Sequence, residues 1–343
     1  MKTGLLERLA TWENFLGLLT VAVLAYAVLA VPNFATGFNI SQAIAGASER
    51  ALIVLPMVLL IIAREIDLSV ASILALSSVV FGVLIQAGYG QEIAILGALA
   101  TGILCGAFNG ALVTYLGLPS LVVTLGTMAM FRGIGYIILG TDSVNEFPDS
   151  FTDFGINTLG DSPLPWTIVP FLVLAPVFAI ILQKTAIGRR IYALGGSPDT
   201  ALYAGVRVAR IRLSLFIVSG LVSAIASIVF TARLANARAD NAIGLELDVI
   251  TIALLGGVSV FGGKGKLTGV FLALVLIATL RNVLGLSQIG GDAQGTVIGL
   301  LLILSLLMST TAQRFYTVLQ SALAPDRPAR PGSSGRAGKS KAP

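Results

Sequence analysis

The dominant pattern along the chain is a series of long apolar runs separated by short polar connections. A helix needs about 20 apolar residues to cross a bilayer, and most of the runs reach that length. We therefore predict an all-α polytopic membrane protein with about ten transmembrane helices. The run at 248–262 is short and rich in glycine, so we expect a broken or re-entrant segment there. The predicted spans are 12–31, 43–63, 68–88, 93–116, 119–139, 164–183, 212–231, 248–262, 267–286 and 295–311.

Charge in the polar connections predicts the orientation of these spans. The connection 141–165 carries acidic residues without a Lys or Arg, whereas the connection 184–211 is rich in arginine. By the positive-inside rule, the acidic connection faces outward and the basic connection faces the cytoplasm. Ten crossings then place both termini in the cytoplasm. We expect a cytoplasmic N-terminus at 1–11, a transmembrane domain at 12–311 and a basic, disordered cytoplasmic tail at 312–343.

The first apolar run resembles a signal peptide only superficially. It is longer than the apolar region of a signal peptide, which spans about 7–15 residues, and no clear cleavage site follows it. We therefore expect it to be a retained first span.

Composition narrows the chemistry that this chain can perform. It is 56% hydrophobic and 11% charged, with a net charge of +5, no histidine and one cysteine, Cys105. Soluble domains carry roughly 25% charged residues, so the chain is far outside that class. The missing histidines and cysteine partners exclude an internal disulfide, a His/Cys metal site and a Ser-His-Asp triad. We therefore expect neither a catalytic site nor a metal site nor a nucleic-acid surface.

A short helix with complete capping signals interrupts the basic connection. Ser197 is a favourable N-cap, Pro198 suits the first helical position, Asp199 favours the positive end of the helix dipole, and Gly205 can end the helix. An isolated helix of about two turns is marginal in water. We therefore expect this helix to dock against another surface.

The glycine-rich stretch 256–269 invites comparison with a nucleotide-binding loop. The phosphate-binding loop has the pattern G-x-x-x-x-G-K-[ST], but here Gly265 follows Lys264. We expect a cytoplasmic turn between helices and no nucleotide or other cofactor site in this chain.

Several residues within or beside the spans suggest contacts between helices, and two of them allow two interpretations each. Asn109 either bonds another helix or lines a cavity, and Arg132 either extends toward the surface or faces a polar pathway. Asp67 is predicted to cap the third span. Gly102 and Gly106, with Gly110 at the same spacing, predict a face for close helix packing.

Four stretches, taken together and in order, resemble the monosaccharide permeases of bacterial ATP-binding-cassette (ABC) importers, a family that includes the ribose, xylose and rhamnose permeases. The related autoinducer-2 importer permease looks similar too. Family members usually read GGIDLSVGS where this chain has AREIDLSVAS, so Arg64 and Glu65 replace a glycine pair. The segment 237–240 and the stretch LRNVLGLSQIGGDAQGTVIG favour the rhamnose-type branch. The matching stretches are EIDLSVAS, GAFNGALVTYLGLPSLVVTLGTMAMFRG, GRRIYALGGSPDTALYAGV and LELDVITIALLGGVSVFGGKGKLTG.

The resemblance implies a non-catalytic permease subunit of the bacterial inner membrane. Its implied partners are two ATPase subunits that bind ATP and Mg, a periplasmic sugar-binding protein, membrane lipid, and a second permease copy or paralogue in a dimer. It also implies that the helix in the basic connection couples to the ATPase. From polarity and position we add a candidate substrate path, Asn109, Thr124 and Thr127. The implied coupling residues are Gly196, Ser197, Pro198, Asp199, Ala201, Leu202, Ala204 and Gly205.

Two other classes remain as alternatives. A solitary facilitator or secondary transporter is the first, but the predicted span interiors carry few ionisable residues, which argues against proton coupling. An intramembrane enzyme is the second, and the sequence offers no histidine, cysteine pair or paired intramembrane carboxylates for it.

Overall fold

The computed structural model describes residues 12–291, 293–301 and 303, and the elements in this part of the chain are helices. Residues 293–301 continue the helical pattern wherever they are described. The helices are α2 (Trp12–Ala30), α3 (Gly37–Ile62), α4 (Val70–Gln86), α5 (Gln91–Tyr115), α6 (Ser120–Leu139), α7 (Asp149–Ile156), the short 3-10 helix η1 (Trp166–Ile168), α8 (Val169–Lys184), α9 (Ala186–Gly196), α10 (Pro198–Tyr203), α11 (Val208–Leu234), α12 (Leu245–Leu255) and α13 (Leu267–Leu286).

Seven helical segments in the described residues are long and apolar enough to cross a membrane. They are α2, α3, α5, α6, η1 with α8, α11 and α13, and α4 is a shorter apolar helix of 17 residues. This confirms an all-α polytopic membrane protein. The predicted span 295–311 lies partly outside the described residues, and 1–11 and 312–343 lie wholly outside them.

The predicted span 248–262 contains a short helix followed by a turn. α12 has 11 residues, so it extends only roughly 16 Å, about half the thickness of a bilayer core. Glycine at 256 and 257 then ends it, and Gly257 adopts a left-handed φ of 87°. The expectation of a broken segment is confirmed, and the stretch 256–266 is the turn that joins α12 to α13.

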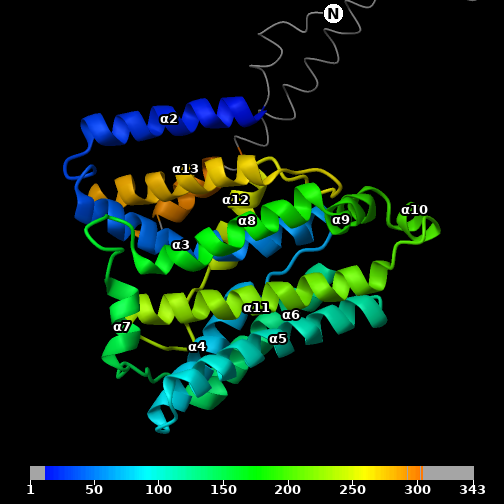
Figure 1. The fold of residues 1–343 in the computed structure, drawn as a ribbon, viewed down its shortest axis with the longest axis horizontal. Helices are drawn as coiled ribbons and strands as arrows, with labels where there is room; N and C mark the ends of the chain where they lie inside the picture. The colour runs from blue at the N-terminus through cyan, green and yellow to red at the C-terminus, as the bar shows by residue number, and fades with distance from the viewer. Residues whose placement is uncertain (1–11, 292, 302, 304–343) are drawn as a thin grey trace, which may run out of the picture. The chain divides into compact units, whose positions relative to one another are not determined.

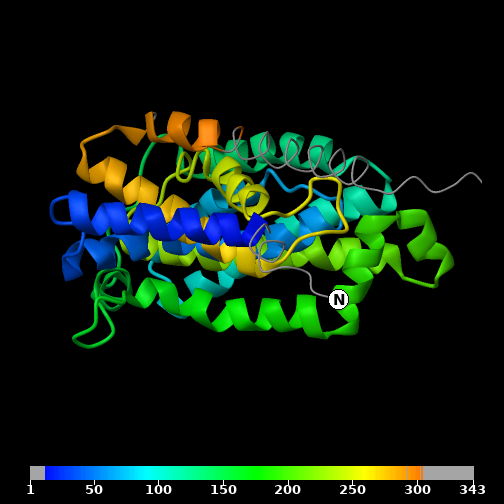
Figure 2. The same ribbon diagram turned by 90° about the horizontal axis from the view of Figure 1, so that it is seen from above.

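The long helices run side by side, and the two charged connections lie at opposite ends of them (Figure 1). α7, in the acidic connection, is at one end, and α9 and α10, in the basic connection, are at the other. A view turned by 90° shows the same separation (Figure 2). The structure thus matches the charge pattern, which requires the two connections to lie on different sides of the membrane.

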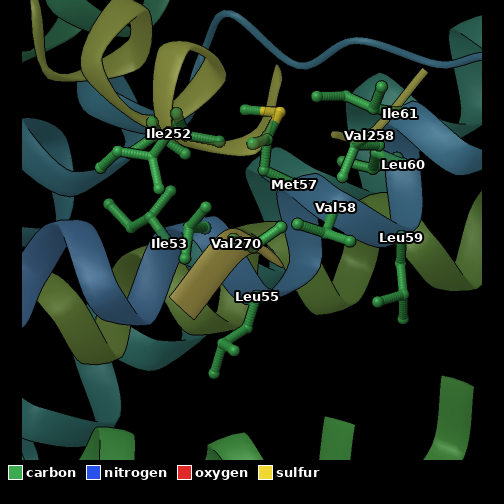
Figure 3. Packing of buried hydrophobic residues seen from close by; sticks show 14 of the residues in the cluster. Ile53, Leu55, Met57, Val58, Leu59, Leu60, Ile61, Ile252, Val258 and Val270 are labelled. Atoms are coloured by element: carbon green, nitrogen blue, oxygen red, sulfur yellow. The ribbon is translucent and has the colours of Figure 1, made fainter. Parts of the chain in front are cut away.

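α3 is the most enclosed of the seven candidate spans. In its most apolar window, 78% of the residues are buried inside the protein, and it contacts α8, α11, α12 and α13. Figure 3 shows its apolar side chains close to Ile252 of α12, Val258 of the following turn and Val270 of α13. A helix hydrophobic on every face is expected at such a central position.

α5 and α11 pack closely along the face that the glycine spacing predicts. A Cβ at Gly102 would collide with the carbonyl oxygen of Gly220, and a Cβ at Gly106 would collide with that of Phe216. Only the absence of side chains lets the two backbones approach this closely. The predicted packing face is therefore confirmed.

Candidate functional site

The short helix α10 begins as its capping residues predict. Ser197 has extended backbone angles, with φ −158° and ψ 107°, and its Oγ accepts a hydrogen bond from the Thr200 amide at 3.3 Å. Pro198 occupies the first turn, where a missing N–H removes no bond. Gly205 has a φ of 79°, which a residue with a side chain adopts only at a cost. The sequence thus specifies both ends of the helix.

The outer face of α10 is apolar and exposed. Leu202 is 61% exposed and Tyr203 is 91% exposed. Tyr203 was not among the residues that the sequence indicated, although it directly follows Leu202. Ala201 is 2% exposed, because it faces the protein's own interior, so it does not form part of this outer face. The remaining predicted coupling residues are Gly196, Asp199, Ala204 and Gly205, which are exposed, and Ser197 and Pro198, which are half-buried.

Arg64 joins α10 to two other connections at the same end of the helices. Its Nε donates to the carbonyl oxygen of Phe261 at 2.7 Å, and its Nη2 donates to that of Gly196 at 2.9 Å. The amide of Gly263 also donates to the carbonyl oxygen of Ile62, at 2.8 Å. Three segments distant in sequence therefore meet here: the α3–α4 loop, the residue before the N-cap of α10, and the α12–α13 turn.

This junction requires unusual backbone geometry. Arg64 has a left-handed φ of 65°, where glycine is the favoured residue. Gly195 has no room for a side chain, because a Cβ there would collide with the carbonyl oxygen of Ile62. Tyr192 closes the other side, and its hydroxyl donates to the carbonyl oxygen of Gly265 at 2.6 Å. Phe261, at the edge of the junction, is 84% exposed and is a further apolar side chain presented at this end of the helices.

The inner part of the α3–α4 loop is held by a buried polar network around Asp67. Its Oδ1 accepts from the amide and the hydroxyl of Ser69, at 3.0 and 2.6 Å, and its Oδ2 accepts from Ser219 of α11 at 2.9 Å. The N-cap of α4 is Ser69, not Asp67, so the predicted capping role was wrong. Asp67 instead fixes the loop to α11.

Two of the three predicted substrate-path residues hold the same loop. Asn109 Nδ2 donates to the hydroxyl of Ser69 at 2.8 Å, and Thr124 Oγ1 bonds the carbonyl oxygens of Ser120 at 2.8 Å and Ile66 at 3.2 Å. Thr127 is buried on α6, one turn from Thr124. Asn109 Oδ1 is buried without a hydrogen-bond partner in the described part of the chain. All three residues thus contribute to packing or hydrogen bonding between helices and the loop, and their role in a substrate path stays a prediction.

The spans contain more ionisable groups than the few that we expected from the sequence. Near the middle of α3, Glu49 forms an ion pair with Arg233 at 2.7 Å. The next residue, Arg50, pairs with Asp248 of α12 at 2.9 Å. Asp248 also accepts from Arg281 of α13 at 2.6 Å. The expectation of nearly charge-free span interiors was therefore wrong. Glu49 and Arg50 lie inside the predicted span 43–63, and the predicted spans 248–262 and 267–286 contain Asp248 and Arg281.

The remaining charged candidates are tied to the connection between α11 and α12. Arg132 Nη1 donates to the carbonyl oxygens of Ala239 at 2.8 Å and Asn241 at 3.1 Å, so it ties α6 to this connection. Arg238 forms a two-pronged contact with Asp240, and this hydrogen-bonded guanidinium lowers the pKa of the Asp240 carboxyl group.

Comparisons with known proteins agree on a class of transport component. Residues 39–306 match the family described as branched-chain amino acid transport system, permease component. The D-allose transport system permease protein AlsC of Escherichia coli K12 is 35% identical over 295 residues, which cover 85% of this chain and 90% of that protein. The autoinducer 2 import system permease protein LsrD of Klebsiella pneumoniae is 35% identical over 259 residues, covering 74% and 77%. LsrD of Escherichia coli K12 is 33% identical over the same length. No solved structure matches the chain.

Proposed function

The chain belongs to the family of transport-system permease components that these matches define, and from that premise we propose that it is the membrane-spanning subunit of an ABC importer. In this proposal the subunit itself hydrolyses nothing. ATP and Mg are bound by two partner ATPase subunits on the cytoplasmic side, and α10 docks onto them. A periplasmic binding protein delivers the substrate on the other side.

The observation that carries the proposal is the exposed apolar face of α10, joined by Arg64 to the end of α3. Leu202 and Tyr203 are costly to leave in water, and aromatic residues are frequent anchors of protein interfaces. Because α10 has only six residues, we expect it to move as one unit with the ATPase surface to which it docks. A shift of the ATPase would therefore be passed through Gly196 and Arg64 to α3.

α3 extends this coupling into the membrane. It is one helix from Gly37 to Ile62, and it begins and ends on opposite sides of the protein. Pro56 within it lacks the N–H that would bond the preceding turn, so bending is easiest there. We infer that closure of the ATPase pair shifts the end of α3 and the adjoining loop, which alternately opens the pathway to each side.

For the substrate we propose a small hydroxyl-rich molecule of the monosaccharide class. The permease named for D-allose and the permeases named for autoinducer 2 support this class equally, so autoinducer 2 is the second candidate. The rhamnose-type elements around 237–240 make L-rhamnose a further candidate substrate. The family description names branched-chain amino acids, and leucine is therefore the comparison substrate.

The proposed assembly also specifies an orientation. α9 and α10 face the cytoplasm of a bacterium, the acidic connection faces the periplasm, and the N-terminal segment 1–11 and the tail 312–343 are cytoplasmic. The permease forms a dimer in the inner membrane, surrounded by lipid, with an identical copy or a paralogue.

Reconstitution tests the function directly. The permease is placed in liposomes with its ATPase inside and its binding protein outside, and uptake of labelled D-allose, L-rhamnose, autoinducer 2 and leucine is measured. We expect uptake of one hydroxyl-rich substrate only when ATP is present in the lumen. Equal uptake without the ATPase would instead establish a solitary facilitator, and uptake of leucine alone would refute the substrate class.

A further inference from the structure

A cavity of about 190 Å³ lies between α3, α12 and α13. Its wall includes Gln42, Gly46 and Arg50, which are one helical turn apart on one face of α3. Arg281 and Asn282 of α13 complete the polar part of the wall, and Ala278 is among the small residues that leave the space open. The wall of the cavity is therefore mainly apolar, and these polar side chains form one part of it.

Two arginines share one carboxylate at this cavity. Asp248 Oδ2 accepts from Arg50 Nε at 2.9 Å and its Oδ1 accepts from Arg281 Nη2 at 2.6 Å. The triad has a net charge of +1. The Arg281 Nε–H is buried and unpartnered within the described residues. Arg50 Nη1 donates to the carbonyl oxygen of Gly46 at 2.7 Å. The side chains of Arg50 and Arg281 are 24% and 22% exposed, so part of each guanidinium group remains accessible to a ligand.

The position of the triad is as informative as its charge. Arg50 lies near the middle of α3, and Asp248 is in the first turn of α12, a helix too short to cross the bilayer. Charged side chains at membrane depth are costly and mark ligand pathways. Broken helices at that depth supply ligand sites in many transporters. The cavity, the charged triad and the short helix α12 lie together at this place in the protein.

We propose that this cavity is a binding site for the transported molecule within the membrane, in which Arg50, Arg281 and the amide of Gln42 donate hydrogen bonds to ligand hydroxyl oxygens. The inference rests on the proposed import function and adds the site and the binding chemistry. Asp248 is not part of the cavity wall; it pairs with both guanidinium groups and offsets one of their two positive charges.

The volume and the donor pattern select the ligand class. Pockets for drug-sized ligands measure about 300–1,000 Å³, so 190 Å³ suits one molecule of smaller size. Each guanidinium offers five N–H donors, of which Asp248 uses only some. Asn39 and Asn282 bond each other through both amide groups, at 2.9 Å each way, and leave further donors and acceptors near the rim. A neutral polyol uses both kinds of group.

Cysteine protection tests the site, because Cys105 is the sole cysteine and is buried. Gly46→Cys is introduced into a Cys105→Ala background, since a Cβ at Gly46 meets open space. Gly37→Cys is the matched control, because it lies on the same helix, at its first residue, and also meets open space. The complete importer in vesicles is treated with a membrane-impermeant thiol reagent from the binding-protein side. The treatment is made with and without the one of D-allose, L-rhamnose and autoinducer 2 that the importer takes up, called the sugar below.

We expect the sugar to slow modification of Gly46→Cys and to leave Gly37→Cys unchanged. Arg281→Gln should weaken this protection by about tenfold, the effect of losing a hydrogen bond to a charged group. If Arg281→Gln fails to accumulate, Gln42→Ala at the rim serves as the second variant, with a smaller loss of protection.

Three results would overturn the inference. The first is equal modification of Gly46→Cys with and without a sugar that the importer takes up. The second is protection by inorganic phosphate but not by that sugar. The third is no modification of Gly46→Cys while Gly37→Cys reacts. Each is recorded with ATP-dependent sugar uptake intact. Absence of uptake for every sugar would instead count against the proposed function, so the two failures are distinguishable.

Discussion

The guanidinium group of Arg64 donates a hydrogen bond to the carbonyl oxygen of Gly196 at 2.9 Å, and so ties the end of α3 to the beginning of α10. The same side chain also bonds the carbonyl oxygen of Phe261. One residue thus connects the central helix of the membrane domain with the exposed apolar surface at the end of the protein.

Two opposing effects at Arg64 predict a definite order of stability. The left-handed φ of 65° costs about 1–2 kcal/mol for a residue with a side chain, whereas the two hydrogen bonds stabilise the junction. Arg64→Ala keeps the strain and loses the bonds, while Arg64→Gly loses both. We expect thermal unfolding midpoints in detergent to fall in the order wild type, Arg64→Gly, Arg64→Ala. An Arg64→Ala protein as stable as wild type would show that the bonds contribute nothing.

Leu202 should be essential for coupling but not for folding. Leu202→Asp places a charge on a face that is already exposed, so the unfolding midpoint should hardly change. Binding to the ATPase should weaken by about 30-fold, since residues of this kind contribute about 2 kcal/mol at an interface. Co-purification of the ATPase and ATP-dependent uptake measure the loss.

Thr200→Asp is the matched control for the introduced charge. Thr200 is exposed on the same helix, near its N-terminus, where an acidic residue is favourable. Retained coupling in Thr200→Asp, together with its loss in Leu202→Asp, identifies apolar contact as the cause. Normal uptake by Leu202→Asp would refute docking through this face.

Glycine substitutions separate close packing from helix propensity. Gly106→Ala forces a methyl group against the backbone of Phe216, so we expect a destabilisation of about 1–3 kcal/mol from overpacking. Gly126→Ala on α6 meets open space and should raise stability by about 0.5–1 kcal/mol, the ordinary gain of alanine over glycine in a helix. Unfolding midpoints in one detergent compare the two. An equal effect of both substitutions would contradict the packing role of the α5–α11 face.

The features that the sequence predicts well are those encoded over a few residues. The length of the apolar runs locates the spans, glycine at 256 and 257 shortens α12, and the capping chemistry of Ser197 begins α10 where expected. The glycine spacing at 102 and 106 likewise identifies a packing face, because helical periodicity aligns residues four apart.

The features that the sequence could not supply are contacts between distant segments. Arg50 and Asp248 are 198 positions apart, and Arg64 and Gly196 are 132 apart, so a single sequence does not indicate that they meet. The sequence does not reveal the burial of Ala201 for a related reason. The buried side of a six-residue helix is decided by the protein surface beneath it and not by its own composition.

The N-cap of α10 gives the most local of the predictions. Ser197→Ala removes the acceptor for the Thr200 amide and should cost about 1 kcal/mol of helix stability. Because α10 has only six residues, that loss frays the helix without unfolding the membrane domain. Amide hydrogen exchange in a peptide spanning 196–205 should therefore accelerate by several-fold, and ATP-dependent uptake should fall, while the unfolding midpoint stays constant. Ser197→Asp retains an acceptor at the cap and should keep both exchange and uptake close to wild type. If Ser197→Ala exchanged as slowly as Ser197→Asp, the helix would be held by its packing alone, and its capping sequence would have no part in presenting Leu202 and Tyr203.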